Sequence, residues 1–183
     1  MGVAPELMIV KSRSQAGDWP VYAVTEGPSR GTEVNSTGGF ANVGAQYWNS
    51  TNPTSAQFSV GNNAAVNSSG ATYVAYLFAS APGVSKVGSY TGTGATQVIN
   101  CGFAAGARFV LIKRTDSTGD WYVWDSARGI VAGNDPYLRL NSTAAEVTNT
   151  DWVDTAASGF ELSNAGGNLV NTNGASYIFL AIS

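Results

Sequence analysis

The chain has 183 residues and a formal net charge of −3; it contains no histidine, and 11% of its residues are charged. Without histidine, Ser-His-Asp triads, Cys-His pairs and histidine-ligated metal sites are excluded. The absence of a Lys/Arg cluster also argues against nucleic acid as a partner, because phosphate neutralisation needs a concentrated basic surface.

The first predicted strand covers residues 7–13 and leads to a Gly-Asp-Trp triplet at residues 17–19. Residues 109–114 and a second Gly-Asp-Trp at residues 119–121 repeat this arrangement without a gap. Apolar runs bounded by Gly, Asn, Asp and Ser are typical of strands and their turns. We therefore predict a β-hairpin at each place, with the triplet in its turn.

The triplet residues have a predicted structural role. Asp18 and Asp120 are expected to accept backbone hydrogen bonds and hold the turns, and Gly119 is expected to supply a positive φ. Trp19 and Trp121 occupy equivalent positions in a duplicated scaffold, which favours packing in the core.

Further segments repeat along the chain and define two copies of one unit. Residues 48–51, 58–60 and 66–74 of the first copy correspond to residues 152–155, 160–162 and 170–178 of the second. Each copy then closes with an apolar strand. We place the copies at residues 2–80 and 85–183.

The second copy opens with a predicted strand at residues 85–92, for which the first copy has no equivalent. An unpaired sheet edge invites association. We therefore expect either that the chain is excised from a longer protein, or that a neighbouring segment or chain supplies the missing strand.

These patterns predict an all-β protein, with no segment of sustained helical period. About a dozen strands, six or seven per copy, suit a two-sheet β-sandwich of the lectin-like or jelly-roll-like kind, with pseudo-two-fold symmetry over residues 1–183. The alternative is two small tandem β domains that divide near residues 81–85.

Carboxylate chemistry is the remaining route to an enzyme, since a glycosidase needs two carboxyl groups about 5 to 10 Å apart. Asp120 with Asp125, and Asp151 with Asp154, are the candidate pairs. Neither pair is repeated in the first copy, so we predict that the protein is not an enzyme and has no catalytic residues.

No metal or cofactor is predicted. Asp116 and Asp120 have a spacing that could contribute to a calcium site, but Ser14 replaces Asp116 in the first copy and turn chemistry explains the residues more simply. The single cysteine, Cys101, excludes an internal disulfide and is expected to be a small buried side chain.

Any ligand site is expected where the two copies differ. Trp124 aligns with Tyr22 and could either fill the core or stack on a sugar ring. The candidate ligand-binding residues are Trp124, Asp125, Arg128, Trp48 and Asp135. Asn35 and Asn141 belong to Asn-x-Ser/Thr triplets, which are expected by chance in a chain so rich in Asn, Ser and Thr.

The second copy carries a recognisable set of short motifs. They are Ile-Lys-Arg at residues 112–114 before Gly-Asp-Trp, Trp-Asp-Ser-Ala-Arg at 124–128, Ser-Tyr-Thr-Gly at 89–92, and a closing strand after Gly174. The combination resembles a poorly characterised repeat domain of bacteriophage tail-fibre and other virion structural proteins. The resemblance implies a place on the virion surface and a role in assembly or host-surface contact.

The expected function is therefore that of a non-enzymatic virion component, a tail-fibre or surface-appendage module in a symmetric homo-oligomer with other virion proteins as partners. The alternatives are a carbohydrate-binding module that recognises a host-surface glycan, and a capsid decoration protein. No run of 18 apolar residues and no charged-then-apolar leader occurs, so we expect neither membrane insertion nor a secretory signal.

Overall fold

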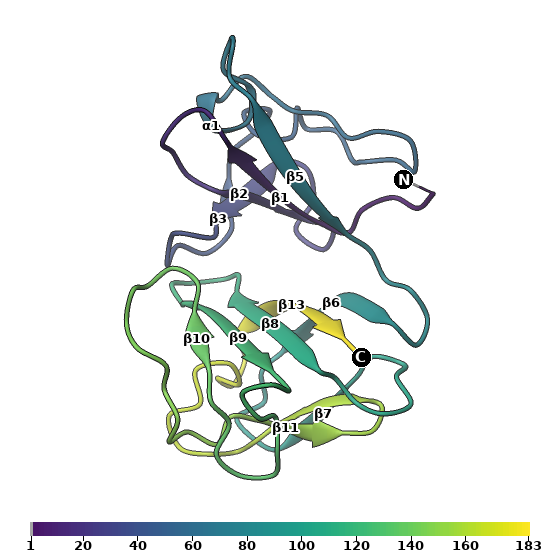
Figure 1. Ribbon diagram of the computed structural model, residues 1–183, viewed down its shortest axis with the longest axis vertical. Coiled ribbons are helices and arrows are strands. Elements are labelled where there is room, and N and C mark those ends of the chain that lie inside the picture. Colours follow the sequence, from purple (N-terminus) through teal and green to yellow (C-terminus); the bar gives the residue numbers. More distant parts are fainter. Residues whose placement is uncertain (1) are drawn as a thin grey trace. The chain divides into compact units, whose positions relative to one another are not determined.

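The computed structural model describes residues 2–183 and divides the chain into two compact units, Met1–Ala79 and Ser80–Ser183. The described residues form thirteen strands in three antiparallel sheets and one helix of four residues (Figure 1). The predicted all-β class is confirmed. The division falls beside the boundary of the two-domain alternative, and the preference for one sandwich over the whole chain stays a prediction.

The first unit contains one five-stranded sheet in the order β4-β3-β2-β1-β5. A short helix, α1 (Ala64–Asn67), precedes β5, and the side chain of Asn63 caps it by accepting a hydrogen bond from the amide of Ala65. The strands are β1 (Leu7–Ser12), β2 (Pro20–Ala23), β3 (Arg30–Glu33), β4 (Ala41–Asn42) and β5 (Tyr73–Phe78).

One face of this sheet forms the core of the first unit, because alternate residues of a strand point to the same side. Met8, Val10 and Tyr22 from the strands pack against side chains from the segment between β4 and β5. That segment contributes Tyr47, Trp48 and Val66.

The second unit contains a five-stranded sheet in the order β10-β9-β8-β13-β6 and a three-stranded sheet in the order β11-β12-β7. The strands of the larger sheet are β6 (Ser85–Thr91), β8 (Phe109–Arg114), β9 (Trp121–Asp125), β10 (Leu138–Arg139) and β13 (Ser176–Ile182). Those of the smaller sheet are β7 (Gln97–Asn100), β11 (Val153–Ala156) and β12 (Gly159–Leu162).

The two sheets of the second unit share one hydrophobic core, as in a β-sandwich. Ile112 and Phe179 from the larger sheet belong to the same buried cluster as Phe160 and Leu162 from the smaller one. The rings of Phe160 and Phe179 meet edge to face, with centroids 5.4 Å apart.

The duplication is visible in the strand register. Met8 on β1 lies opposite Leu77 on β5, and the equivalent Val110 on β8 lies opposite Ala181 on β13. The copies differ in size, however, with five strands in the first unit and eight in the second. The expectation of six or seven strands in each copy was therefore wrong.

The lead-in strand of the second copy is β6, which pairs with β13 from Ser85 opposite Ile182 to Thr91 opposite Ser176. In the first unit, β5 is the end strand of its sheet, and no strand among residues 2–183 pairs with its outer edge. No helix in the described part of the chain is long and apolar enough to cross a bilayer.

Candidate functional site

A side-chain amide closes the first Gly-Asp-Trp turn. Asn35 donates a hydrogen bond from Nδ2 to Oδ1 of Asp18 (2.8 Å), and its own Oδ1 accepts one from the backbone N–H of Trp19 (3.0 Å). Asp18 therefore holds the turn through the asparagine that follows β3. Trp19 is only partly buried, so the prediction that it fills the core does not hold for this copy.

The second turn is closed in the same way. Asn141 donates to Oδ1 of Asp120 (2.6 Å) and accepts from the backbone N–H of Trp121 (2.8 Å). Asp120 also receives an ion pair from Arg139 (3.4 Å). Trp121 is buried, with 1% of its surface exposed, and the ammonium group of Lys113 lies 5.9 Å from its ring centroid.

The asparagines Asn35 and Asn141 are the residues that sequence reasoning missed. Each begins an identical Asn-Ser-Thr triplet just after β3 or β10. This repetition was the available signal. It was obscured because the loop from β9 to β10 is longer than the loop from β2 to β3.

Gly119 has a different role from the one predicted. Its φ is not positive. Instead, a Cβ atom at this position would lie 3.0 Å from Cβ of Arg114. Glycine is needed here because the loop passes close to β8, which is a packing constraint rather than a conformational one.

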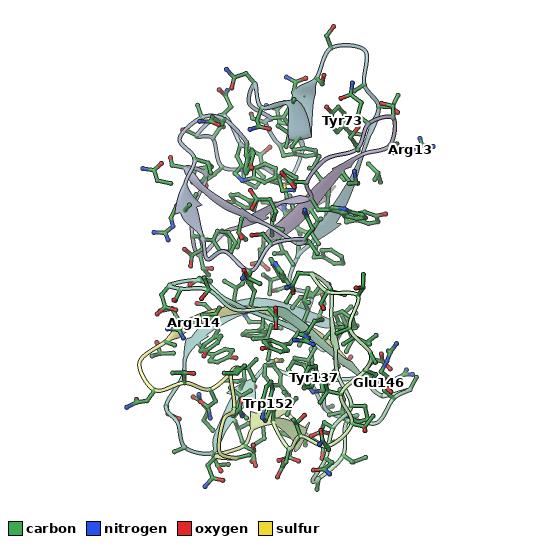
Figure 2. The ribbon with its side chains drawn as sticks, turned by 90° about the vertical axis from the view of Figure 1, so that its left-hand side faces the viewer. Arg13, Tyr73, Arg114, Tyr137, Glu146 and Trp152 are labelled. Carbon is green, nitrogen blue, oxygen red and sulfur yellow. The ribbon has the colours of Figure 1, made fainter. Side chains whose placement is uncertain are left out.

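The candidate tryptophans Trp48 and Trp124 are both completely buried, with 0% of their surface exposed. The ring of Trp124 lies 5.6 Å from that of Tyr137, which in turn stacks on Trp152 with centroids 5.1 Å apart. Tyr137 and Trp152 are labelled in Figure 2. Of the two roles that the sequence left open for Trp124, its burial fits the core. A sugar at the surface could not reach either indole face.

The candidate residues Asp125 and Arg128 form a capped loop on the surface. Oδ1 of Asp125 accepts hydrogen bonds from the backbone N–H groups of Ala127 (3.0 Å) and Arg128 (2.9 Å). The guanidinium group of Arg128 contacts Asp125 and, through Nε, Oε1 of Glu146 at 2.8 Å. These contacts fix the start of the β9–β10 loop.

Asp116 is engaged in local structure. It pairs with Nε of Arg114 at 2.8 Å and accepts a hydrogen bond from the backbone N–H of Ser176. The hydrogen bond from Arg114 lowers the pKa of Asp116 below its usual value. Cys101 is buried, and burial raises the pKa of its thiol to about 11.

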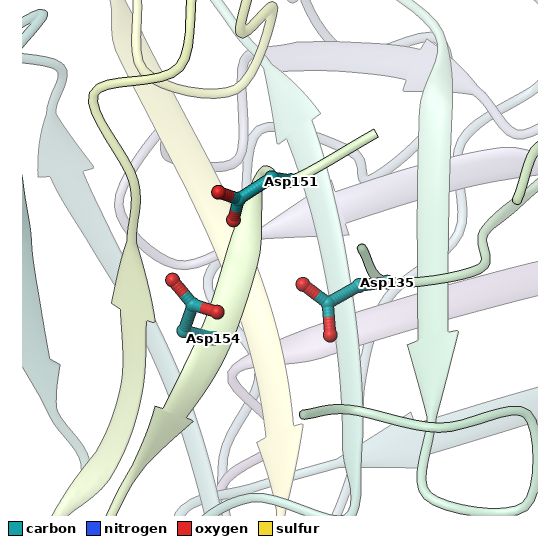
Figure 3. Close-up of side chains that lie close together, drawn as sticks. All are labelled: Asp135, Asp151 and Asp154. Carbon is teal, nitrogen blue, oxygen red and sulfur yellow. The ribbon is translucent and has the colours of Figure 1, made fainter. Parts of the chain in front are cut away.

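Asp135 lies beside two further carboxylates, those of Asp151 and Asp154. The three residues come from the β9–β10 loop, the segment just before β11, and β11 itself, and each offers a carboxylate oxygen within 4.8 Å of the other two. Figure 3 shows the three carboxyl groups turned toward one another. We call this group the aspartate cluster.

Asp135 is the buried member of the aspartate cluster, with 0% of its surface exposed. Its Oδ1 accepts a hydrogen bond from the backbone N–H of Val131 (2.8 Å), and its backbone N–H donates to the carbonyl of Thr150. Burial raises the pKa of Asp135 to about 7, and the nearby charges of Asp154 and Asp151 act in the same direction.

The other two carboxylates are half-buried. Asp154 accepts a hydrogen bond from the backbone N–H of Gly133 (2.9 Å), and burial raises the pKa of Asp151. Three polar atoms in this region are buried and find no hydrogen-bond partner within residues 2–183. They are Oδ2 of Asp135, Oδ1 of Asp151 and Oγ1 of Thr150.

The sequence had singled out Asp135 as a loop residue and Asp151 with Asp154 as a carboxylate pair. It did not join the three, because their closeness depends on the β9–β10 loop folding back on the start of β11. Asp135 itself is buried and out of reach of a sugar, whereas Asp151 and Asp154 are partly exposed.

An open depression of about 550 Å³ lies in the first unit, beside the loop that follows Trp48. Its lining is mostly backbone and amide groups, including Asn42, Gln46, Asn49 and Asn62. No aromatic side chain lines it, so it lacks a stacking surface for a sugar.

Comparison with known proteins gives one result. No curated protein and no solved structure matches the chain. A family model described as a domain of unknown function, DUF7483, matches residues 1–183. The chain therefore belongs to the DUF7483 family.

Proposed function

We propose that this chain is a non-enzymatic component of a bacteriophage virion, a tail-fibre or surface-appendage module that assembles with copies of itself and with other virion proteins. The motifs of the second copy, which resemble a virion repeat domain, support the location. The unpaired edge of β5 supports the role in assembly and is the observation on which the proposal depends.

The contrast between β5 and its equivalent β13 carries this argument. Residues Tyr177–Ala181 of β13 are buried, whereas Tyr76 on β5 exposes 46% of its surface and its neighbours on the strand are partly exposed. The backbone edges differ as well, because β6 pairs with the outer edge of β13 and no strand among residues 2–79 pairs with that of β5.

The edge of β5 is chemically suited to strand addition. Arg13 donates its backbone N–H to the carbonyl of Thr72, and hydrogen-bonded pairs alternate along an antiparallel ladder. The N–H and C=O groups of Ala75 therefore point away from β1. The strand reads Tyr-Val-Ala-Tyr-Leu-Phe and has no charged residue of the kind that protects natural edges.

A second copy of this chain is the occupant that we assign to the edge. Two β5 strands can pair antiparallel about a two-fold axis, which is the commonest symmetry of soluble oligomers. Each strand then satisfies the outward-pointing backbone groups of the other, as β6 does for β13 in the second unit.

Light scattering coupled to size-exclusion chromatography tests this assembly. We expect the wild-type chain to be an oligomer and the variants Ala75→Pro and Tyr76→Lys to shift to monomer with unchanged circular dichroism. Proline removes an outward N–H without breaking a bond to β1, and lysine adds a charge to the edge. Val98→Lys is the matched control, because Val98 is also an exposed residue of an end strand.

A wild-type chain that is monomeric at every concentration would refute assembly through β5. The location is tested separately, by antibody labelling of intact particles that encode this chain. A handful of copies per particle fits an appendage and hundreds fit a capsid decoration protein, whereas absence from particles contradicts a virion role altogether.

A further inference from the structure

We propose that the aspartate cluster, Asp135, Asp151 and Asp154, is a calcium-binding site in the second unit. The proposal is independent of the virion role and rests on the geometry, burial and charge of the cluster.

The ligand atoms have the right chemistry and spacing. Each of the three side chains offers a carboxylate oxygen within 4.8 Å of the other two. A cation at the centre would therefore lie no more than about 2.8 Å from each oxygen (4.8/√3), and a small inward movement of the side chains would give the distance of about 2.3 to 2.6 Å that calcium ligands have. Figure 3 shows that the carboxyl groups face this common point. The cluster is thus arranged to surround an ion.

Asp135 differs from the carboxylates of an ordinary surface cluster because it is buried. Its side chain is completely buried, and its Oδ2 has no hydrogen-bond partner of normal geometry in the described part of the chain. The backbone N–H of Val153 is near enough to the carboxyl group to lower its pKa, but it does not complete a hydrogen bond of that kind. A buried carboxylate oxygen without a partner is costly. A bound cation would give this atom the partner that the protein does not supply.

Two neighbouring oxygens share this condition. Oδ1 of Asp151 and Oγ1 of Thr150 are also buried and unpaired among residues 2–183. Calcium takes six to eight oxygen ligands. The three carboxylates can supply up to six oxygens, and water can complete such a shell.

The negative charge of the cluster is not balanced by the protein. None of the ion pairs formed within residues 2–183 includes Asp135, Asp151 or Asp154. Three neighbouring carboxylates without a basic partner repel one another. A divalent cation would relieve this repulsion.

In the first unit, other residues occupy the positions equivalent to the aspartate cluster, and the strand pairing identifies these positions. Gly31 pairs with Ala41 there as Tyr137 pairs with Val147 in the second unit. The position two residues earlier is therefore Ser29 in the first unit and Asp135 in the second.

Two of the three carboxylates are replaced by hydroxyl groups in the first unit. Ser29 occupies the position of Asp135, and Ser50 occupies that of Asp154. The two serines are hydrogen-bonded to each other, Oγ to Oγ, at 3.4 Å. Two neutral hydroxyl groups can thus satisfy each other at this place, and no cation is needed to balance charge.

A tyrosine exchange makes room for the third carboxylate. In the first unit the ring of Tyr47, at the position of Asp151, packs over Gly31, where a Cβ would lie 2.8 Å from the ring. In the second unit Tyr137 replaces Gly31 and stacks on Trp152. The tyrosine ring therefore comes from position 137 in the second unit instead of the position equivalent to Tyr47. Position 151 is then free to hold an aspartate.

Calcium suits the cluster better than other common divalent ions. Zinc prefers nitrogen and sulfur ligands, and the cluster offers oxygen alone. Magnesium demands a small, nearly ideal octahedron. Carboxylates from a loop, a strand and the segment between them form an irregular set, which calcium tolerates.

The experiment is a titration of the purified full-length chain with Ca²⁺, followed by thermal unfolding and by luminescence of the calcium mimic Tb³⁺. We expect one saturable Tb³⁺ site, sensitised by the nearby Trp152 and displaced by Ca²⁺. At about 100 times the Kd of Ca²⁺, we expect the Tm of the second unit to rise by about 5 °C or more, with no such rise from NaCl at equal ionic strength.

Asp154→Asn and Asp151→Asn remove one charge each and retain the shape of the side chain. We expect both variants to lose the saturable Tb³⁺ signal and the Ca²⁺-dependent rise in Tm. Without calcium, we expect their Tm to equal or exceed that of the wild type, because one repulsive charge is gone. A purely structural role for these carboxylates predicts the opposite, a lower Tm.

Glu26→Gln is the matched control, since it makes the same change of charge at the ion pair of Glu26 with Arg30 in the first unit. It is expected to retain the full response to Ca²⁺ and Tb³⁺. A wild-type Tm that does not respond to Ca²⁺, or a Tb³⁺ signal that persists in Asp154→Asn, would overturn the proposal.

Discussion

Asn35 and Asn141 each close a Gly-Asp-Trp turn through a side-chain amide group. One amide group bonds an aspartate through its N–H and a tryptophan N–H through its oxygen. The carboxylate in the triplet is thereby tied to an asparagine that lies just after β3 in the first copy and just after β10 in the second. We call this pair of hydrogen bonds the clamp: the Gly-Asp-Trp motif is one half of it, and the asparagine, well over a dozen residues further along the chain, is the other.

The clamp predicts a sharp effect of a single substitution. Asn141→Ala leaves the N–H of Trp121 and the carboxylate of Asp120 without their shared partner, so the free energy of unfolding should fall by about 1–3 kcal/mol. Chemical denaturation measures the change. Asn149→Ala, at an exposed asparagine of the same unit, should change stability by less than about 0.5 kcal/mol; equal effects of the two substitutions would argue against the clamp.

The glycines of the two triplets should respond differently to the same substitution. A Cβ at Gly119 would lie 3.0 Å from Arg114, whereas a Cβ at Gly17 meets nothing within 4 Å, and neither residue has a positive φ. Gly17→Ala should therefore be neutral or stabilise the protein by up to about 1 kcal/mol. Gly119→Ala should destabilise it by a similar amount, and thermal unfolding of the two variants decides.

At the residue scale, the sequence predicted that Asp18 and Asp120 hold the turns, but by accepting backbone hydrogen bonds. In the structure these carboxylates accept hydrogen bonds from side chains, among them the equivalent asparagine of each turn, and the sequence did not predict the aspartate cluster. Asp135 and Asp151 lie far apart along the chain, and no local pattern indicates that a loop brings them together. Burial of Trp124 could not be read from the sequence either, because an aromatic residue on a strand suits a core and a binding face equally well.

At the scale of elements, the pairing of β6 with β13 depends on a glycine of one strand that leaves room for an aromatic ring of the other. Gly88 lies opposite Phe179, and a Cβ at Gly88 would lie 2.7 Å from that ring. No strand among residues 2–79 corresponds to β6, and Ala75 stands at the position of Phe179. The large ring of Phe179 therefore occurs in the copy in which a neighbouring strand, β6, places a glycine opposite it.

This match makes Gly88 sensitive to a single added methyl group. Gly88→Ala should force the buried ring of Phe179 to move and lower the stability of the second unit by about 1–3 kcal/mol. Gly166→Ala, where a Cβ meets nothing within 4 Å, is the control and should have little effect. Denaturant unfolding of both variants provides the comparison, and a stable Gly88→Ala protein would show that the ring adapts freely.

Strands and hairpins were largely predictable because their alternation and turn residues are local signals. The strand count per copy was not, because the smaller sheet depends on β7, which pairs with β12. Among residues 2–79, no strand corresponds to β7, and the segment equivalent to β11 and β12 contains no strand.

At the scale of the whole molecule, low charge governs how the chain is expected to associate. With 11% of its residues charged and a net charge of −3, the chain offers little for salt to screen. Association through β5 would use backbone hydrogen bonds and apolar side chains. Its dissociation constant should change less than about threefold between 50 and 500 mM NaCl, as measured by analytical ultracentrifugation; a steep salt dependence would indicate a charged interface elsewhere.

The unpaired edge of β5 also sets a limit on how far such association can proceed. When two β5 strands pair about a two-fold axis, the outer edges of both strands are hydrogen-bonded to each other, and neither edge remains open to a third chain. Among the other end strands, β4 and β10 have only two residues each, β6 carries Lys86 and β11 carries Asp154, features that discourage further pairing, whereas β7 carries no charge. Association of this kind is self-terminating, so a structure built from it should contain an even number of chains and should not grow into a fibre.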